Sequence, residues 1–460
     1  MANGISPLKE FKFLQKKERF NRKIVFSPLL LVPLALVVIS SILIKSVQGE
    51  FAQSDFLNHF FTGVLGYFLA IFISYIPIER IRKFLIPFYI SSLISLFSIY
   101  FFGITISGAQ RWLSLGIFSF QPSEVAKLST ILILALVLEK KIISSVKDLL
   151  LPFFIVIVPW LLIFFQPDLG TSLVLIVLTC VMLYWSQMPI EWILILGFCI
   201  LTSIFYLVFP KFLIIWIPFI GYLAYRSSEK KIMFSICTLV LHSLVIKFTP
   251  IIWIPFIVYL AYRSSQKKIV FSMFTLALHS LVIKFTPILW EFGLKDYQKD
   301  RLILFLDPGR DPLGGGYHLI QSKIAIGSGG LFGTGLLNGK LTNLQFIPEQ
   351  HTDFIFSALG EELGFLGCFL VLFLFFILIS QLLKVSKNAR TNFESLIVIG
   401  IASTFLFQII INLFMTIGLG PVTGIPLPFM SYGRTSLFIN FICIGISLSI
   451  LYRSRSLRNR

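Results

Sequence analysis

Residues 24–44, IVFSPLLLVPLALVVISSILI, form the first long apolar run of the chain and decide its class. The run carries no charge and is roughly 20 residues long, the length that an α-helix needs to cross a membrane. A basic head precedes it and no small-residue cleavage site accompanies it. We therefore expect a retained membrane span and no removed signal peptide.

Composition extends this conclusion to the whole chain. Of the 460 residues, 57% are hydrophobic and only 13% are charged, and the mean hydropathy is +0.90. A soluble globular protein would have about a quarter of its residues charged. The sequence therefore predicts an all-α polytopic membrane protein, because helices satisfy their own backbone groups in lipid.

The formal net charge of +18 indicates orientation rather than a nucleic-acid partner. The cations gather between apolar runs, as the positive-inside rule predicts for cytoplasmic segments. No aromatic-interleaved basic groove accompanies them, so we predict no nucleic-acid binding. Both termini are expected in the cytoplasm. The clusters occupy residues 9–23, 79–83, 140–141, 384–390 and 453–460.

The apolar runs divide the chain into six parts. We predict a basic cytoplasmic N-terminus at 1–23, transmembrane helices 1–7 at 24–209, repeated hairpins at 210–289, an extracytoplasmic loop at 290–353, C-terminal transmembrane helices at 354–452 and a basic cytoplasmic tail at 453–460. Other expected outer segments are 103–123 and 419–434.

Residues 216–252 and 253–289 are tandem copies of one another. The two 37-residue copies differ at only seven positions. Each copy has two apolar runs around a cationic Arg-Ser-Ser-x-Lys-Lys turn, which predicts a helical hairpin with a cytoplasmic turn. Two crossings per copy leave the side of the following loop unchanged. We assign the repeat no catalytic role.

The most polar interruption of the chain is RLILFLDPGRDPLGGGYHLIQSKIAIGSGGLFGTGLLNGKLTNLQFIPEQHTD at residues 301–353. Such a turn-rich stretch between membrane spans is expected to carry function rather than to cross the bilayer. Its candidate acids and bases are Asp307, Asp311, Glu349, His351 and Asp353. Its candidates for binding an anion are Lys299, Arg301, Arg310 and Lys323.

Two further polar clusters reach the same side of the membrane. Glu124 and Lys127 lie three residues apart, on one face of a predicted helix, where an intramembrane ionisable pair is by default a functional hypothesis. The alternative is a structural pair that fixes the helix. Asp168 precedes another span and has the alternative role of helix cap. Arg111 lies in the polar stretch before Glu124.

The glycines at 327, 329, 330, 333 and 335 do not make a dinucleotide fingerprint. The GxGxxG spacing is missing and no βαβ unit flanks them. We interpret them as a flexible or tightly turning backbone whose N–H groups are candidates for approaching phosphate oxygens or a sugar chain.

Five motifs, in order, resemble the SEDS family (shape, elongation, division and sporulation). They are RWLSLGIFSFQPSEVAK, QPDLGTS, DYQKDRLILFLDPGRDPLGGGYHLIQSKIAIGSGGLFGTG, FIPEQHTDFIFSALGEELG and PVTGIPLPFMSYG. The details around Asp307, Asp311 and Ile425 are more similar to the elongation branch, RodA, than to the division branch, FtsW.

The resemblance implies a peptidoglycan glycosyltransferase that polymerises lipid II, an undecaprenyl diphosphate-linked disaccharide peptide, on the outer face of the cytoplasmic (inner) membrane. It also implies a class B penicillin-binding protein and other elongation-complex membrane proteins as partners. The implied fold is a SEDS-like core of about ten helices, to which the two hairpins add about four, giving about 14 transmembrane segments.

The resemblance also implies that Asp311 is the essential loop acid. A base there would accept a proton from the attacking sugar hydroxyl. Arg111, Arg301, Lys323 or a divalent cation such as Mg or Mn would stabilise the departing diphosphate; no cofactor is certain. Glu124 and Lys127 match a family pair near a central cavity, and Asp168 and His351 complete the set of candidate substrate-binding residues.

Two departures and two other functions remain open. Thr334 stands where many relatives have Lys, and Arg434 replaces a usual Gly. A flippase for the lipid-linked precursor would also use intramembrane charges, but it would favour inverted repeats rather than a direct tandem copy. A noncatalytic scaffold of the cell-wall synthesis complex would tolerate Asp311→Ala.

Overall fold

The computed structural model of the chain describes residues 27–48, 53–140, 146–188, 193, 281–311 and 316–458, apart from 107–108, 115, 117–118, 283, 345 and 348–349. The chain divides into two compact units, one of 1–141, 151–182 and 300–460 and the other of 142–150 and 183–299. Nearly all of the tandem repeat, like the expected seventh span near 190–209, lies outside the described residues. Apart from Lys299, the candidate site residues belong to the first unit.

The described part is mainly helical, as the sequence predicts. Among the described residues, seven helices are long and apolar enough to cross a membrane. The long helices are α2 (Pro28–Gln48), α3 (Gln53–Tyr75), α5 (Leu85–Phe102), α6 (Pro122–Leu138), α7 (Val146–Phe165), α8 (Leu169–Trp185), α17 (Ile355–Lys387), α18 (Asn392–Ile417) and α19 (Arg434–Arg458).

The core lies among α6, α18 and α19, whose residues are mostly buried, whereas α3 and α5 expose much of their surface. Helix α3 packs closely on α19 through small residues. A methyl group at Gly66 would collide with the Phe441 ring, and one at Gly445 would lie 2.8 Å from the Ala70 carbonyl oxygen. Such contacts let helix backbones approach one another in a membrane, where the hydrophobic effect does not drive helices together.

The predicted outer segment 103–123 contains a small sheet that the sequence analysis did not predict. Its strands are β1 (Gly103–Ile106), β2 (Ala109–Ser114) and β3 (Ser119–Phe120), paired antiparallel in that order. Leu113 pairs with Gly103 on one side and with Phe120 on the other. Arg111 therefore lies on the central strand of a sheet, at the point where the pairing with β1 shifts its register, and not on a free loop.

The long polar segment also has regular structure. It contains the π-helical turn η3 (Leu289–Gly293), α14 (Asp296–Leu306), the 3-10 turn η4 (Pro308–Arg310), α15 (Tyr317–Ser328) and α16 (Lys340–Asn343). Helix α15 packs against α17 and α18. The Asp311 turn is therefore attached directly to the helix bundle.

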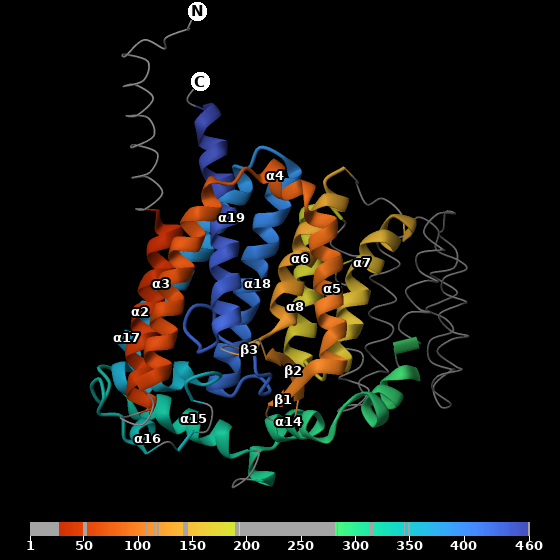
Figure 1. The fold of residues 1–460 in the computed structure, drawn as a ribbon. Coiled ribbons are helices and arrows are strands. Elements are labelled where there is room, and N and C mark those ends of the chain that lie inside the picture. The colour runs from red at the N-terminus through yellow and green to blue at the C-terminus, as the bar shows by residue number, and fades with distance from the viewer. Residues whose placement is uncertain are drawn as a thin grey trace, which may run out of the picture. The chain divides into compact units, whose positions relative to one another are not determined.

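Within the first unit, the basic and the glycine-rich segments lie at opposite ends of the bundle. Figure 1 shows the short basic helix α4 (Ile78–Lys83) near the C-terminal end of α19, and the sheet, α15 and α16 at the other end. Arg453 Nη1 lies 3.6 Å from Glu79 Oε2, which places α4 beside the end of α19. Which of the two ends faces the cytoplasm stays a prediction from the charges.

Candidate active site

Glu124 and Lys127 form an ion pair inside the helix bundle. Pro122 starts α6, where a missing N–H breaks no helical hydrogen bond. The spacing of three residues then places both charged side chains on one face. Lys127 Nζ donates to Glu124 Oε1 at 2.8 Å, and the two side chains are 5% and 3% exposed. The sequence analysis predicted this proximity, and the burial makes the pair costly to disrupt.

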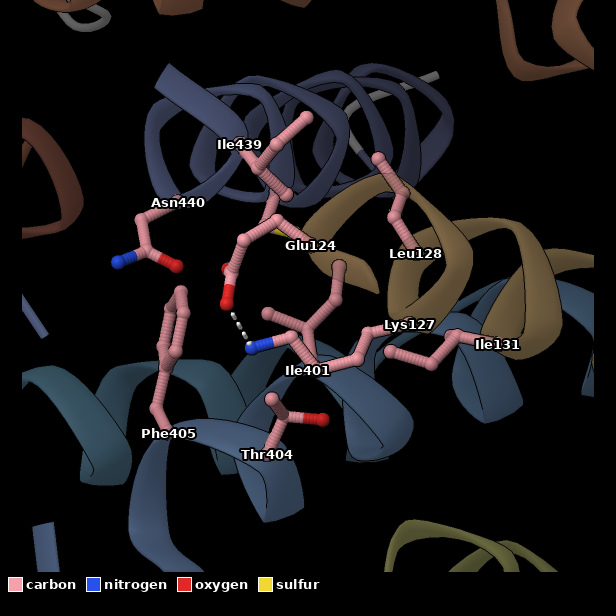
Figure 2. Close-up of a pocket in the computed structure, with 10 residues that line it drawn as sticks. Glu124, Lys127, Leu128, Ile131, Ile401, Thr404, Phe405, Ile439 and Asn440 are labelled. Atoms are coloured by element: carbon pink, nitrogen blue, oxygen red, sulfur yellow. Dashed lines mark hydrogen bonds and ion pairs between the residues drawn. The ribbon is translucent and has the colours of Figure 1, made fainter. Parts of the chain in front are cut away.

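The pair lines a narrow pocket between α6, α18 and α19 (Figure 2). Figure 2 shows Asn440 and Phe405 beside the Glu124 carboxylate. In the described part of the chain, Glu124 Oε2 is buried and accepts no hydrogen bond. The pocket has room for about one water molecule, which would satisfy that oxygen. It is too small to hold a sugar as it stands.

Asp168 caps helix α8. Its Oδ1 accepts a hydrogen bond from the Thr171 backbone N–H at 3.1 Å, and its Oδ2 accepts one from the Thr171 hydroxyl at 2.8 Å. The aspartate thus satisfies an N–H group that the first turn of a helix leaves free. Of the two roles that the sequence left open, the structure shows the cap.

Arg111 is held by the turn between α7 and α8. Its guanidinium lies 3.8 Å from Asp168 Oδ1 and donates to the carbonyl oxygens of Gln166, at 3.4 Å, and Pro167. The Ser123 hydroxyl donates to Asp168 Oδ2 at 3.5 Å, which joins the start of α6 to the start of α8. Arg111 and Asp168 therefore form one structural unit beside the Glu124 helix.

Asp311 lies in the turn between η4 and α15. Its side chain is exposed, and so is that of Asp307 on the other side of η4. The Asp311 carbonyl oxygen accepts a hydrogen bond from the Gly316 N–H at 3.0 Å, which closes the turn. Residues 312–315 lie outside the described part. Asp311 is thus an exposed residue on a turn that is fixed to the bundle.

Arg301 and Asp353 approach the same glycine. A methyl group at Gly424 would lie 3.6 Å from Arg301 Nη1 and 3.5 Å from Asp353 Oδ2. Asn412 Nδ2 donates to the carbonyl oxygens of Asp353 and Ile425, each at 2.9 Å. Arg301 is thus placed beside a carboxylate and the 419–433 segment, at the border of the outer surface.

Lys323 and His351 lie at two other places on the outer end. The exposed Lys323 side chain crosses Gly418, the left-handed cap of α18. The His351 ring lies 5.7 Å from the Tyr432 ring, and its carbonyl oxygen accepts a hydrogen bond from the Tyr432 N–H at 3.0 Å.

Tyr432 connects His351 to helix α3. Its hydroxyl donates to Asp55 Oδ1 at 2.9 Å. Burial and this carboxylate raise the pKa of Tyr432, so the hydroxyl stays protonated and keeps donating. The contacts of His351 indicate a structural position, so its proposed substrate contact stays a prediction.

Comparisons with known proteins agree with the motifs. The family model for FtsW, RodA and SpoVE, described as cell cycle proteins, matches residues 21–217 and 228–456. The chain is 32% identical over 388 residues to the peptidoglycan glycosyltransferase MrdB of Escherichia coli (strain K12), covering 84% of this chain and 82% of that protein. It is 33% identical over 400 residues to the peptidoglycan glycosyltransferase RodA of Treponema pallidum (strain Nichols), covering 86% and 89%.

The chain belongs to the SEDS family. Its fold agrees with a chain of a solved peptidoglycan synthase complex, described as coordinating polymerization and crosslinking, with a TM-score of 0.62 and 26% identity over 93% of this chain and 97% of that one. This SEDS protein is therefore a multi-pass membrane protein of the RodA and MrdB type.

Sequence reasoning missed the role of Glu361 in this SEDS protein. Its buried carboxylate accepts hydrogen bonds from the backbone N–H groups of Leu341, at 2.8 Å, and Thr342, at 2.9 Å, and from the Thr342 hydroxyl at 2.6 Å. It thereby holds the start of α16. The signal was the acid in GEELG, which sits in an apolar run without a cation beside it in the sequence.

The glycine-rich stretch also differs from its interpretation as an approach to phosphate. The Thr334 and Gly335 N–H groups donate to the carbonyl oxygens of Glu361, at 2.9 Å, and Glu362, at 3.0 Å. These N–H groups bind α17. The glycines therefore serve a close approach between two backbones of the protein.

A divalent cation has no protein cage among the described residues. No group of three or more His, Cys, Asp or Glu side chains is close enough there to hold a metal. Mg²⁺ is commonly held by one or two carboxylates together with substrate phosphates. Asp311 fits that smaller donor set, so a metal at this carboxylate stays a prediction.

Proposed function

We propose that this SEDS protein is a peptidoglycan glycosyltransferase that polymerises lipid II into glycan strands during cell elongation and the maintenance of cell shape. Two relatives that it matches over most of their length are named peptidoglycan glycosyltransferases. The observation that carries the proposal is the exposed Asp311 carboxylate on a turn fixed to the end of the bundle opposite the basic helix α4.

Asp311 acts as the general base in this proposal. The attacking sugar hydroxyl gives its proton to the Asp311 carboxylate while its oxygen forms a bond to the anomeric carbon of the other substrate. The bond between that carbon and the diphosphate oxygen breaks, and the polyprenyl diphosphate leaves with the electron pair. One carboxylate is enough, because diphosphate leaves without the protonation that a sugar leaving group needs.

Lys323, Arg301 and Arg111 are the protein candidates for stabilising the departing diphosphate. Lys323 is exposed at the end of the bundle that carries α15, and Arg301 lies beside Gly424 on the outer segment. Arg111, the third candidate, already binds three acceptors in the turn between α7 and α8. A cation near the developing charge lowers the barrier most when it is preorganised. A divalent cation held by Asp311 is the alternative supply of charge.

The direct tandem copy at residues 216–289 favours polymerisation over transport of the lipid-linked precursor, because many transporters are built from inverted repeats. A flippase would also pass a disaccharide head group through the bundle. A polymerase needs no such passage, because its acid meets the sugar at the surface. A scaffold role is the remaining alternative and predicts that Asp311 is dispensable.

The proposed setting is the cytoplasmic membrane, with both termini in the cytoplasm and Asp311 outside. The proposed partners are a class B penicillin-binding protein and other membrane proteins of the elongation complex. A similar solved chain belongs to a peptidoglycan synthase complex, which supports a penicillin-binding partner. Strand synthesis and crosslinking would then occur side by side.

The test compares two activities of the purified protein in liposomes. Polymer formation is followed from purified lipid II with a class B penicillin-binding protein present and absent, and transbilayer movement of a fluorescent lipid II is followed in parallel. We expect polymer and no protein-dependent movement. Movement without polymer would support the flippase, and neither activity with the partner present would support the scaffold.

A further inference from the structure

Residues 329–337, GGLFGTGLL, lie along the kink of α17. Four backbone hydrogen bonds join the two: Thr334 N–H to Glu361 O at 2.9 Å, Gly335 N–H to Glu362 O at 3.0 Å, Phe365 N–H to Gly330 O at 2.9 Å and Leu366 N–H to Leu331 O at 3.2 Å. The hydrogen bonds satisfy backbone N–H and C=O groups of both segments that would otherwise need water.

Two glycines make this approach possible. Gly364 has φ 62° and ψ −159°, a backbone conformation that is essentially restricted to glycine. Gly333 has φ 81°, and a methyl group there would collide with the Glu362 carbonyl oxygen. The 329–337 segment is therefore built to sit against α17 rather than to extend into solvent.

The four large side chains of the segment are apolar and exposed. Leu331 is 64% exposed and Phe332 is 77% exposed, and Leu336 and Leu337 are also exposed. The stretch contains no charged residue. An exposed apolar surface of this kind on a rigid segment marks a contact with lipid or with another protein.

Whether the segment contacts lipid depends on where it lies relative to the boundary of the hydrocarbon core. Residues 363–383 of α17 are 21 residues without a charge, and Lys384 follows them. At 1.5 Å per residue they extend about 31 Å, the thickness of the hydrocarbon core. The other boundary therefore falls near residues 363–364. Gly330 and Leu331 bind the backbone of Phe365 and Leu366, which is the first turn inside that boundary.

The apolar surface is also continuous with the exposed face of the span. Phe365, Leu366, Phe369 and Phe373 are exposed on α17, and Phe365 and Leu366 lie directly beside the segment. Irregular backbone is tolerated at this depth only where its polar groups have partners. The hydrogen bonds to α17 supply them.

We propose that the 329–337 segment is a membrane anchor whose Leu331 and Phe332 side chains insert into the lipid at the boundary opposite the Lys384 end of α17. Aromatic and aliphatic side chains on a segment at the interface bind the bilayer by burying apolar area. We take lipid as the occupant, because the segment is hydrogen-bonded to the first turn of the span inside the boundary and extends its exposed apolar face.

The anchor has a consequence for the proposed reaction, and this consequence rests on the proposed function. Helix α15 joins the Asp311 turn directly to the anchor. A fixed anchor holds this turn near the level of the lipid head groups, where the diphosphate of a lipid-linked substrate lies. The anchor thereby lowers the entropy cost of bringing the Asp311 carboxylate and its substrate together.

The test is photocrosslinking in lipid nanodiscs that contain this protein alone. Phe332 is replaced by its photoreactive analogue p-benzoylphenylalanine, and lipid adducts are measured by mass spectrometry of the labelled peptide. The same analogue at Phe369, on the exposed face of the span, is the positive control. At Phe375, on the buried face of the same span, it is the negative control.

We expect an adduct yield at position 332 similar to that at 369 and about tenfold above that at 375. A yield at 332 as low as that at 375, with normal labelling at 369, would overturn the proposal. Crosslinks from 332 only to a second copy of the chain would also overturn it, because the surface would then be a protein interface. Neither readout depends on enzyme activity, so the result is separate from the fate of the proposed function.

Discussion

Glu124 and Lys127 are two buried charged residues that form an ion pair with each other. Each charge alone would lose its hydration without compensation, whereas the pair lies at 2.8 Å. Among the described residues, Glu124 Oε2 is the atom of the pair that is buried without a hydrogen-bond partner. A structural pair and a functional pair make different predictions about what happens when both charges are removed together.

We predict that Lys127→Met and Glu124→Gln each destabilise the protein by about 3–5 kcal/mol, because each leaves one buried charge unpaired. The double variant should recover most of that loss but should not recover polymerisation if the pair acts on substrate. Thermal unfolding in detergent and lipid II polymerisation measure the two effects. A stable and fully active double variant would show that the pair is only structural.

Two substitutions at Asp168 distinguish its role as a helix cap from its role as the charged partner of Arg111. Asp168→Asn keeps an oxygen that accepts from Thr171 but removes the buried carboxylate beside Arg111, so we predict a loss of about 1–3 kcal/mol. Asp168→Ala also loses the cap and should cost about 1 kcal/mol more. Thermal unfolding of both variants tests the order. Equal losses would mean that the cap contributes nothing.

Elements differ in how well the sequence predicts them. Residues 355–387 form α17 close to the expected span, because a long uncharged run has one stable solution in lipid. The sheet around Arg111 was missed, because its strands are short and the apolar alternation is weak. Helices α15 and α16 were missed, because glycines and prolines around them are typical of loops.

Gly364 is the position on which the α17 kink most depends. We predict that Gly364→Ala costs about 1–3 kcal/mol from its backbone alone, because its φ and ψ are restricted to glycine. The added methyl group would also collide with the Gly333 N–H. Limited proteolysis between α15 and α17 should then become faster.

Gly327→Ala is the matched control for the α17 kink. A methyl group at Gly327, near the end of α15, meets nothing within 4 Å. It should stabilise the helix by up to about 1 kcal/mol and leave proteolysis unchanged. Equal proteolysis rates for Gly364→Ala and Gly327→Ala would show that the α17 kink does not hold the segment between α15 and α17 in place.

At the scale of the whole molecule, the charges at the two ends predict the orientation. A cysteine at Arg310 should react with a membrane-impermeant maleimide in intact cells or spheroplasts, whereas one at Lys83, in the basic helix α4, should react only after permeabilisation. Deleting residues 216–252 should leave both results unchanged, because two crossings leave together. Labelling of position 83 in intact cells would contradict the topology.

The site as a whole was only partly predictable from the sequence. The proximity of Glu124 and Lys127 follows from helical spacing, and the capping role of Asp168 from its place before a span. The meeting of Arg301 and Asp353 at Gly424 joins three segments that are far apart in sequence, so no local pattern contains it. The hydrogen bond from the Leu341 N–H in α16 to Glu361 also joins residues far apart in sequence, so no local pattern predicts it.

The central claim is that polymerisation depends on the Asp311 carboxylate. The most direct measurement is the rate of lipid II polymerisation in liposomes, with a class B penicillin-binding protein present, for wild type, Asp311→Asn and Asp307→Asn. Asp307 is the matched control, because it is an exposed acid on the same turn. We predict at least a 100-fold loss for Asp311→Asn, about the contribution of a general base, and a near wild-type rate for Asp307→Asn. A wild-type rate for Asp311→Asn would contradict the account.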